Sequence, residues 1–153
     1  MNTKINILII SILSFVSCGD VGYDSMPPVI NLIEPEDGAI LKIGSSIHFD
    51  MELSDNEMLF SYKVEIHNAF DGHEHTKSLK AQDGTTPFAF QKSWDVSGQK
   101  NAKIHHHEIV IPQDATPGNY HLMVYCTNAA RIESYIARKI VLSHDGEDGE
   151  HEH

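Results

Sequence analysis

The stretch Pro117-Gly-Asn-Tyr-His-Leu-Met-Val-Tyr-Cys126 decides the fold of this chain. It begins with residues typical of turns, and from Tyr120 onward apolar side chains occupy the even positions. His121, Met123 and Tyr125 occupy the odd positions between them. Because side chains alternate across a β-strand, this period of two predicts a strand with one face in the core and the other in solvent.

Six other segments are also expected to form strands, and turn sequences such as Glu34-Pro-Glu-Asp-Gly38 separate them. No segment has a helical period. Short strands at this spacing predict an all-β fold, an antiparallel immunoglobulin-like β-sandwich of about seven strands. The expected strands are Val29–Ile33, Ser46–Leu53, Leu59–His67, Phe88–Trp94, Ile104–Ile111, Tyr120–Thr127 and Ile132–Leu142.

Two segments resemble known parts of bacterial immunoglobulin-like domains. The sequence from Pro28 to Phe49 resembles their first two strands, and Ile109–Ile111 followed by Pro117–Cys126 resembles strand E, the corner after it and strand F. The resemblance implies that Tyr120 is a tyrosine corner whose hydroxyl bonds back to the backbone of that corner. The chain departs from antibody domains in its strand B, which has no cysteine, and in Trp94, which is not on strand C.

The first residues resemble a bacterial lipoprotein signal. The apolar run from Ile5 to Val16 is too short for a permanent membrane span and follows Lys4, as in a signal-peptide core. Ser17-Cys18 then resembles a lipobox, although Phe15 replaces the usual Leu. This implies that Cys18 is acylated, and several acyl chains would anchor the domain stably. An ordinary secretory signal and an uncleaved anchor are the alternatives.

We therefore divide the chain into a lipoprotein signal peptide (1–17), a lipidated tether (18–28), the sandwich (29–142) and a disordered acidic tail containing histidines (143–153). The expected location is the cell envelope, lipid-anchored to the outer membrane on its periplasmic face or at the cell surface. Acylation of Cys18 leaves Cys126 without a disulfide partner, and its inward parity predicts a small core residue.

The charge of the chain excludes one class of partner. Removal of the signal leaves 10 Lys and Arg residues against 22 Asp and Glu residues, a formal charge of −12. Such an acidic domain repels phosphate backbones, so we expect no nucleic acid partner. Cations are favoured instead.

A cluster of histidines predicts that the chain binds a transition-metal cation. The stretch His67-Asn-Ala-Phe-Asp-Gly-His-Glu-His75 holds three imidazoles near the expected end of a strand, and imidazole is the commonest metal ligand among side chains. Strand parity turns both His67 and His121 outward on neighbouring antiparallel strands, where directly opposed Cβ atoms lie about 4.5–5.5 Å apart. We predict a zinc or copper site whose ligands are His67, Asp71, His73, His75 and His121, with Asp71 either binding the ion or orienting a histidine. The alternative is that each histidine separately occupies a surface loop.

The other histidines are assigned less direct roles. Because Ile109 and Ile111 are expected in the core, parity predicts that His105 and His107 point inward and His106 outward, at the opposite end of the sandwich from His67. A half-buried His107 that is hydrogen-bonded within the fold is favoured over a ligand. His48 is expected to be an exposed strand residue, and the histidines of the tail are expected to hold cations loosely.

Residues 28–142 also resemble a family of Bacteroidota lipoproteins catalogued as domain of unknown function 4625. The resemblance rests on the lipobox, on Glu65–His67 with Phe70–His75, and on Pro117–His121. The family has no established activity, so the resemblance implies fold and location and leaves the chemistry to the residues.

Three functions compete at this point. The first is a lipoprotein that captures, senses, delivers or is stabilised by a transition metal. The second is a binding module without metal, for a glycan or for an outer-membrane uptake protein, which exposed aromatic side chains such as Tyr125 would favour. The third, a hydrolytic zinc enzyme with Glu74 or Asp71 as general base, ranks last because the sequence shows no substrate cleft, so we expect no enzyme.

Overall fold

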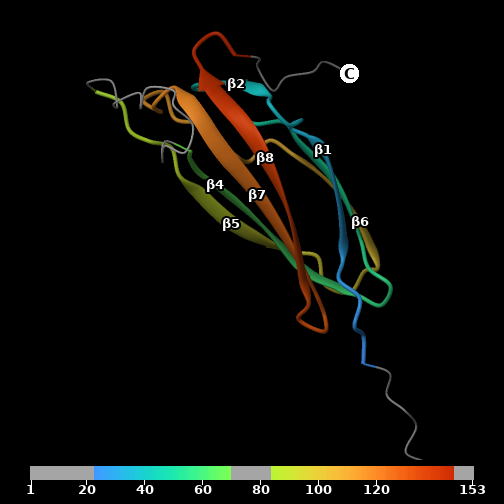
Figure 1. Cartoon of the computed structure of the whole chain (residues 1–153). Helices are drawn as coiled ribbons and strands as arrows, with labels where there is room; N and C mark the ends of the chain where they lie inside the picture. The colour runs from blue at the N-terminus through green and yellow to red at the C-terminus, as the bar shows by residue number, and fades with distance from the viewer. Residues whose placement is uncertain (1–22, 70–83, 147–153) are drawn as a thin grey trace, which may run out of the picture.

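The computed structural model describes residues 23–69 and 84–146, and this part of the chain is a sandwich of two β-sheets without helices (Figure 1). No helix in these residues could span a membrane. The strands are β1 (Val29–Glu34), β2 (Ile40–Lys42), β3 (Phe49–Ser54), β4 (Leu59–Asn68), β5 (Phe90–Asp95), β6 (Asn101–His106), β7 (Gly118–Asn128) and β8 (Glu133–Ser143).

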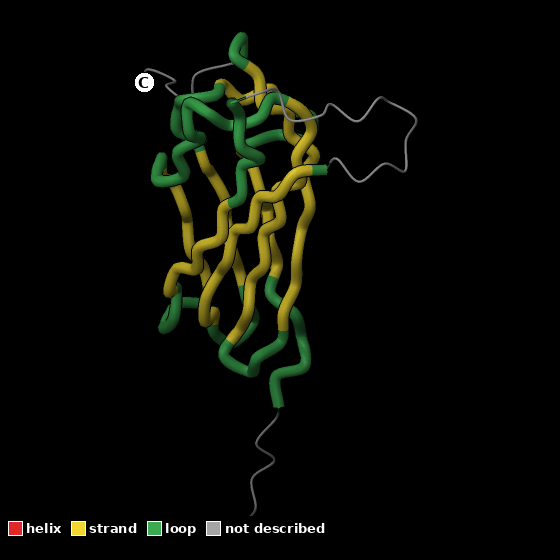
Figure 2. The backbone as a smooth tube through the Cα atoms, turned by 90° about the vertical axis from the view of Figure 1, so that its left-hand side faces the viewer, coloured by secondary structure: helices red, strands yellow, loops and turns green. Residues whose placement is uncertain are grey.

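One sheet has the order β1-β3-β6 and the other the order β2-β8-β7-β4-β5. Their faces pack against each other, and buried side chains of both sheets form one core. The strands of both sheets run between the same two ends of the molecule (Figure 2). All pairs are antiparallel except β2 with β8, which is parallel. The predicted β-sandwich is confirmed. Two details of the strand prediction were wrong: β2 was not expected, and the segment expected as Ile104–Ile111 forms β6 earlier in the chain.

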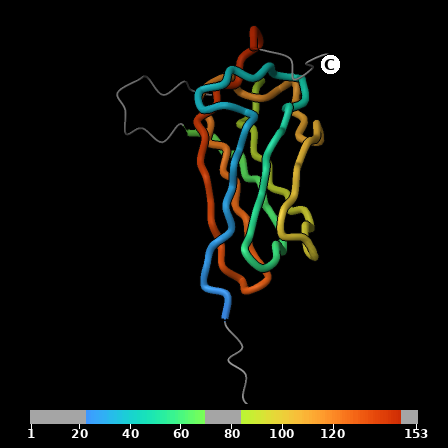
Figure 3. The backbone as a smooth tube through the Cα atoms, turned by 90° about the vertical axis from the view of Figure 1, so that its right-hand side faces the viewer, coloured from blue at the N-terminus to red at the C-terminus, as the bar shows by residue number. Residues whose placement is uncertain are grey.

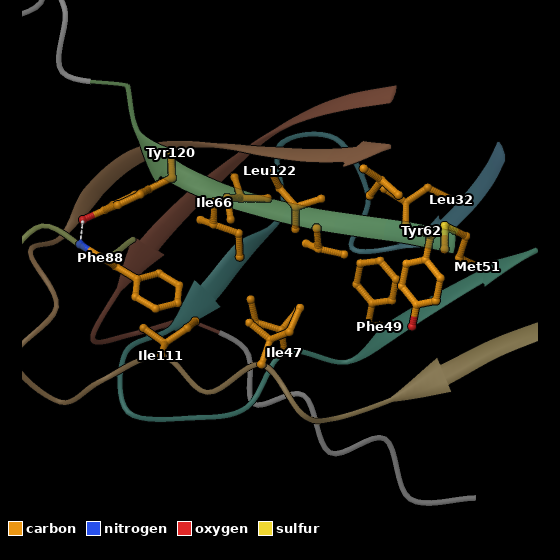
Figure 4. Close-up of a cluster of buried hydrophobic side chains, with 14 of the residues drawn as sticks. Leu32, Ile47, Phe49, Met51, Tyr62, Ile66, Phe88, Ile111, Tyr120 and Leu122 are labelled. Carbon is orange, nitrogen blue, oxygen red and sulfur yellow. Dashed lines mark hydrogen bonds between the residues drawn. The ribbon is translucent and has the colours of Figure 1, made fainter. Parts of the chain in front are cut away.

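The core lies between the sheets and follows the predicted alternation (Figure 4). Even-numbered residues of β4 and β7 are buried, from Tyr62 to Ile66 and from Tyr120 to Cys126. In the other sheet Phe49, Met51 and Leu53 of β3 are buried against them. Burial of these apolar side chains is the main stabilising contribution to such a domain. Cys126 is fully buried, as predicted.

The tyrosine corner is confirmed. The hydroxyl of Tyr120 donates to the carbonyl oxygen of Thr116 at 2.7 Å. It also accepts from the N–H of Phe88 at 3.2 Å, the bond that Figure 4 shows. Tyr120 itself is fully buried. Its hydroxyl therefore joins the corner before β7 to the segment before β5 inside the core.

The strands run between two ends of the sandwich, which we name the base and the distal end (Figure 3). The base holds the incoming segment 23–28 and the turns 55–58, 96–100 and 129–132. The distal end holds the connections from β1 to β3, from β6 to β7 and the end of β8. Residues 24–28, which we assigned to the tether, lie against the base: Pro28 is buried, and its carbonyl oxygen accepts from the hydroxyl of Ser134 at 2.6 Å.

Candidate metal centre

Two groups of histidines lie towards the distal end, on opposite outer faces of the sandwich. We name them the cross-strand pair, which is His67 and His121, and the outer-face cluster, which is His48, Asp50, His105 and His107. The cross-strand pair lies on the five-stranded sheet and the outer-face cluster on the three-stranded sheet.

The cross-strand pair has the predicted geometry. His67 of β4 is directly opposed to His121 of β7, and the centroids of the two rings lie 5.6 Å apart. His67 is exposed and His121 half-buried. The other three predicted ligands, Asp71, His73 and His75, lie outside the described residues.

The carboxylate beside the cross-strand pair is already engaged. Glu65 accepts a hydrogen bond from the ammonium of Lys63 at 2.7 Å, and this bond lowers the pKa of Glu65. The ammonium in turn lies 4.2 Å from the centre of the Tyr125 ring. Among the described residues, the pair therefore offers a cation its two imidazoles and little else.

The outer-face cluster has more ligands in place. Asp50 of β3 is directly opposed to His105 of β6, and His48 precedes Asp50 by two residues, on the same face. One ligand atom from each of His48, Asp50 and His105 can be chosen so that all three atoms lie within 4.8 Å of one another. Two imidazoles and a carboxylate at such short distances from one another form a group that can hold a metal ion.

His107 adds a third imidazole. Its ring centroid lies 4.9 Å from that of His48 and 5.5 Å from that of His105, while His48 and His105 are 4.9 Å apart. The three ring planes are nearly perpendicular to one another, at 79°, 84° and 82°. The rings form a nearly equilateral triangle in which each ring presents an edge to the next.

A β-bulge places His107 beside His105 on the outer face. Phe49 pairs with His106, whereas Ser46 bridges Val110, so the register shifts by one residue between them. His107 and Glu108 consequently stand opposite the single residue His48, which is the arrangement of a bulge. Bulges redirect side chains in this way and are frequent next to functional sites.

The bulge also corrects our parity prediction. We counted back from Ile109, which is fully buried, and expected His105 and His107 to point inward. The extra residue reverses the parity, so His105 and His107 are exposed. They also lie towards the distal end, the same end as His67 and not the opposite one, and His48 is half-buried among their rings.

His106, expected outside, points inward. Its ring stacks on Phe49 and on Trp94, with centroids 5.0 Å away in both cases. Its Nδ1 accepts from the N–H of Glu108 at 3.4 Å, and its Nε2 is buried with no hydrogen-bond partner among the described residues. Burial lowers the pKa of His106, which favours the neutral ring. His106 therefore serves the packing of the sandwich edge.

Glu108, the other residue of the bulge, is turned towards β5. Its carboxylate forms an ion pair with Lys92 and accepts from the indole N–H of Trp94 at 3.1 Å. The hydrogen bond from Lys92 lowers the pKa of Glu108. These contacts fasten the segment after β6 to the neighbouring sheet and so hold His107 in position.

The sequence did contain a signal for this cluster. His48-Phe49-Asp50 and His105-His106-His107 each place two ligands two residues apart, the spacing that puts both on one face of a strand. The prediction missed it because it assigned His48 and His107 one at a time.

The comparisons with known proteins identify the family. No curated protein matches the sequence. A solved structure, a catalytically inactive OgpA from Akkermansia muciniphila in complex with an O-glycopeptide substrate, is similar with a TM-score of 0.48 and 11% identity. The match covers 76% of this chain and 29% of that one. The model of a domain of unknown function, DUF4625, matches residues 16–143. The chain belongs to the DUF4625 family.

Proposed function

We propose that this protein is a lipid-anchored, extracytoplasmic protein that binds a divalent transition-metal ion through the outer-face cluster. The observation that carries the proposal is that His48, Asp50 and His105 bring ligand atoms within 4.8 Å of one another on one sheet face, with the ring of His107 beside them. Nitrogen ligands with one oxygen suit borderline ions such as zinc and copper. An acidic chain also favours cations near its surface.

Zinc and copper both accept imidazole nitrogen and carboxylate oxygen, so the proposal covers both ions. His48, His105 and His107 would supply the nitrogen ligands, and Asp50 would supply the fourth ligand.

The exposure of the cluster favours an ion that exchanges with solvent. His105 and His107 are exposed, while His48 and Asp50 are half-buried. An ion there would be reached from one side of a sheet, without an enclosing shell. Capture or delivery of metal fits such a surface better than permanent stabilisation of the fold.

The cross-strand pair is proposed as a second and weaker site. His67 and His121 supply two imidazoles, and Asp71, His73 and His75 remain proposed ligands that complete it. Among the described residues the pair supplies two imidazoles, against three imidazoles and a carboxylate in the outer-face cluster, so we expect the outer-face cluster to fill first.

Zinc titration of the full chain by calorimetry tests the proposal. His48→Ala and His107→Ala should each weaken the tighter binding event by about tenfold or more, a change of at least about 1.4 kcal/mol. His144→Ala is the matched control, because His144 is exposed at the distal end and outside the cluster. His67→Ala should affect only the weaker event. Equal affinities of His48→Ala, His107→Ala and the control would refute the outer-face site.

The proposed location has its own test. Replacement of Cys18 by Ser should stall processing or move the protein from the membrane to the soluble fraction. A Cys18→Ser variant that still needs detergent for extraction would contradict acylation at this residue.

One observation favours a second candidate, a binding module without metal. Tyr135 is 68% exposed, and its ring lies 6.0 Å from that of Tyr125 on the five-stranded sheet. Exposed aromatic side chains of this kind also occur at binding surfaces for glycans or proteins. A glycan screen with Tyr135→Ala as the comparison would test it, and binding that needs Tyr135 but no metal would favour this candidate.

A further inference from the structure

The base of the sandwich fixes the direction from which the chain enters. Asn128 is fully buried, and its side-chain amide donates to the Asp24 carboxylate at 2.8 Å and to the carbonyl oxygen of Met26 at 3.0 Å. Asp24 also accepts from the side chain of Asn56 at 3.1 Å. These bonds join the incoming segment to the end of β7 and to the turn 55–58.

The proposed anchor lies close to this point in sequence. Cys18 precedes Tyr23 by five residues. At the greatest extension of a peptide chain, that distance is about 18 Å. An acyl chain on Cys18 would therefore hold the base near the membrane surface, whatever path the connecting residues take.

Exposed apolar side chains gather at the base. Tyr23 is 95% exposed, Met26 59% and Met58 43%. Hydrogen bonds connect their segments, since the Met58 carbonyl oxygen accepts from the N–H of Ala129, next to the Asn128 that binds Met26. Tyrosine is enriched where membrane meets water, because its ring is apolar and its hydroxyl polar.

The charges around this patch suit a zwitterionic surface. Exposed Lys100 and Arg131 lie at the base with exposed Glu57, and Lys100 donates to the carbonyl oxygen of Asn56 at 2.7 Å. Asp55 is buried and accepts from the N–H groups of Glu57 and Met58. The charges are mixed, so apolar contact and the anchor would determine the docking, with little selection for anionic lipid.

We propose that the base docks on a phospholipid bilayer through Tyr23, Met26 and Met58. The proposal rests on the lipid anchor of the proposed function. Both histidine groups then lie towards the end of the sandwich that is remote from the membrane, because β3 and β4 extend between the base and the distal end. At about 3.4 Å per residue, His48 lies about 20 Å and His67 about 27 Å beyond the base. The metal sites would be presented to ligands and partners in the aqueous phase.

Position-dependent quenching tests the docking. The full lipidated protein is placed in phosphatidylcholine vesicles, with a fluorophore on Ala130→Cys at the base or on Asp145→Cys at the distal end. Both residues are exposed. Native Cys126 is buried and its thiol pKa is raised, so it will not compete for the label. Lipids with nitroxide headgroups should quench the base label at least several-fold more strongly than the distal label, and equal quenching would overturn the proposal.

A longer tether separates docking from simple tethering. Insertion of a flexible Gly-Ser linker of about 12 residues before Tyr23 should leave the quenching at Ala130→Cys unchanged, because apolar contact holds the base. The same linker with Tyr23, Met26 and Met58 replaced by Ser should abolish it. Loss of quenching with the linker alone would overturn docking. Energy transfer between labels on two protein copies, without quenching by the lipid nitroxides, would also overturn it, because the base would then contact another copy and not the bilayer. Failure of the protein to float with vesicles would instead show that the anchor itself is absent.

Discussion

Asp50 on β3 stands directly across from His105 on β6, on the outer face of the three-stranded sheet. The pair joins a carboxylate to an imidazole beside two further imidazoles, those of His48 and His107. No shape requirement of the core explains a carboxylate here, because the pair lies outside the core. The metal site that we propose would account for it, because a cation would bind both groups.

The first prediction concerns this carboxylate. Asp50→Asn keeps the size of the side chain and removes its charge, so zinc affinity should fall by about tenfold or more if Asp50 is the fourth ligand. Glu52→Gln is the matched control, because Glu52 lies two residues further along the same face and pairs with Lys103 at 3.1 Å. Calorimetric titration compares the two variants. Equal losses in both would mean that general surface charge, and not ligation, attracts the ion.

The second prediction is that zinc stabilises the fold. An ion that binds the folded chain alone adds about 2.7 kcal/mol at a free concentration one hundred times its Kd, so the Tm should rise by several degrees. Since the cluster joins β3 to the residues after β6, the rise should be lost in His107→Ala and kept in His144→Ala. Thermal unfolding followed by circular dichroism with and without zinc provides the measurement. A rise of the same size in both variants would place the ion elsewhere.

The long strands were predictable because their central residues alternate regularly. The even positions are apolar from Tyr62 to Ile66 in β4 and from Tyr120 to Cys126 in β7, which predicted the buried face. This parity, with the antiparallel neighbours expected in an immunoglobulin-like sandwich, predicted the opposition of His67 and His121. Tyr120 was predictable because Pro117–Cys126 resembles the corner and strand F of bacterial immunoglobulin-like domains, which implied a tyrosine corner. A period-two pattern with one buried face specifies the register strongly.

The outer-face cluster was not predictable in the same way. A bulge adds one residue to one strand, and no local feature of His105–Ile109 distinguishes it from an unbroken strand. Parity counted across the bulge is therefore reversed, which misplaced three histidines. The strand β2 was missed because it has only three residues. It pairs in parallel with β8, which is distant in sequence, and no local sequence pattern predicts such a pairing.

The third prediction concerns the tyrosine corner. Tyr120→Phe keeps the buried ring but leaves the Thr116 carbonyl and the Phe88 N–H without their hydroxyl partner. Unpaired buried groups cost about 1–3 kcal/mol, so the free energy of unfolding should fall by that amount. Tyr135→Phe, at an exposed position, should change it by less than about 0.5 kcal/mol. Urea unfolding of the two variants measures the difference. Equal free energies of unfolding would mean that water takes the place of the Tyr120 hydroxyl at both the Thr116 carbonyl and the Phe88 N–H.

The last prediction concerns alkaline stability and Cys126. Burial raises the pKa of its thiol from 9 to about 12, so between these values the unfolded chain releases a proton that the folded chain keeps. Unfolding is therefore favoured as pH rises, and stability falls through this window by up to about 1.4 kcal/mol per pH unit from this group. Burial also raises the pKa of Tyr62, which adds to the loss of stability at higher pH.

Cys126→Ala should lower the free energy of unfolding by about 1 kcal/mol at neutral pH, because it leaves a small cavity. Above pH 9 the stability of this variant should fall less steeply than that of the native protein. Urea unfolding at a series of pH values compares the two proteins. Parallel curves, or rapid reaction of the native thiol with a disulfide reagent, would show that Cys126 is accessible to solvent in the folded state.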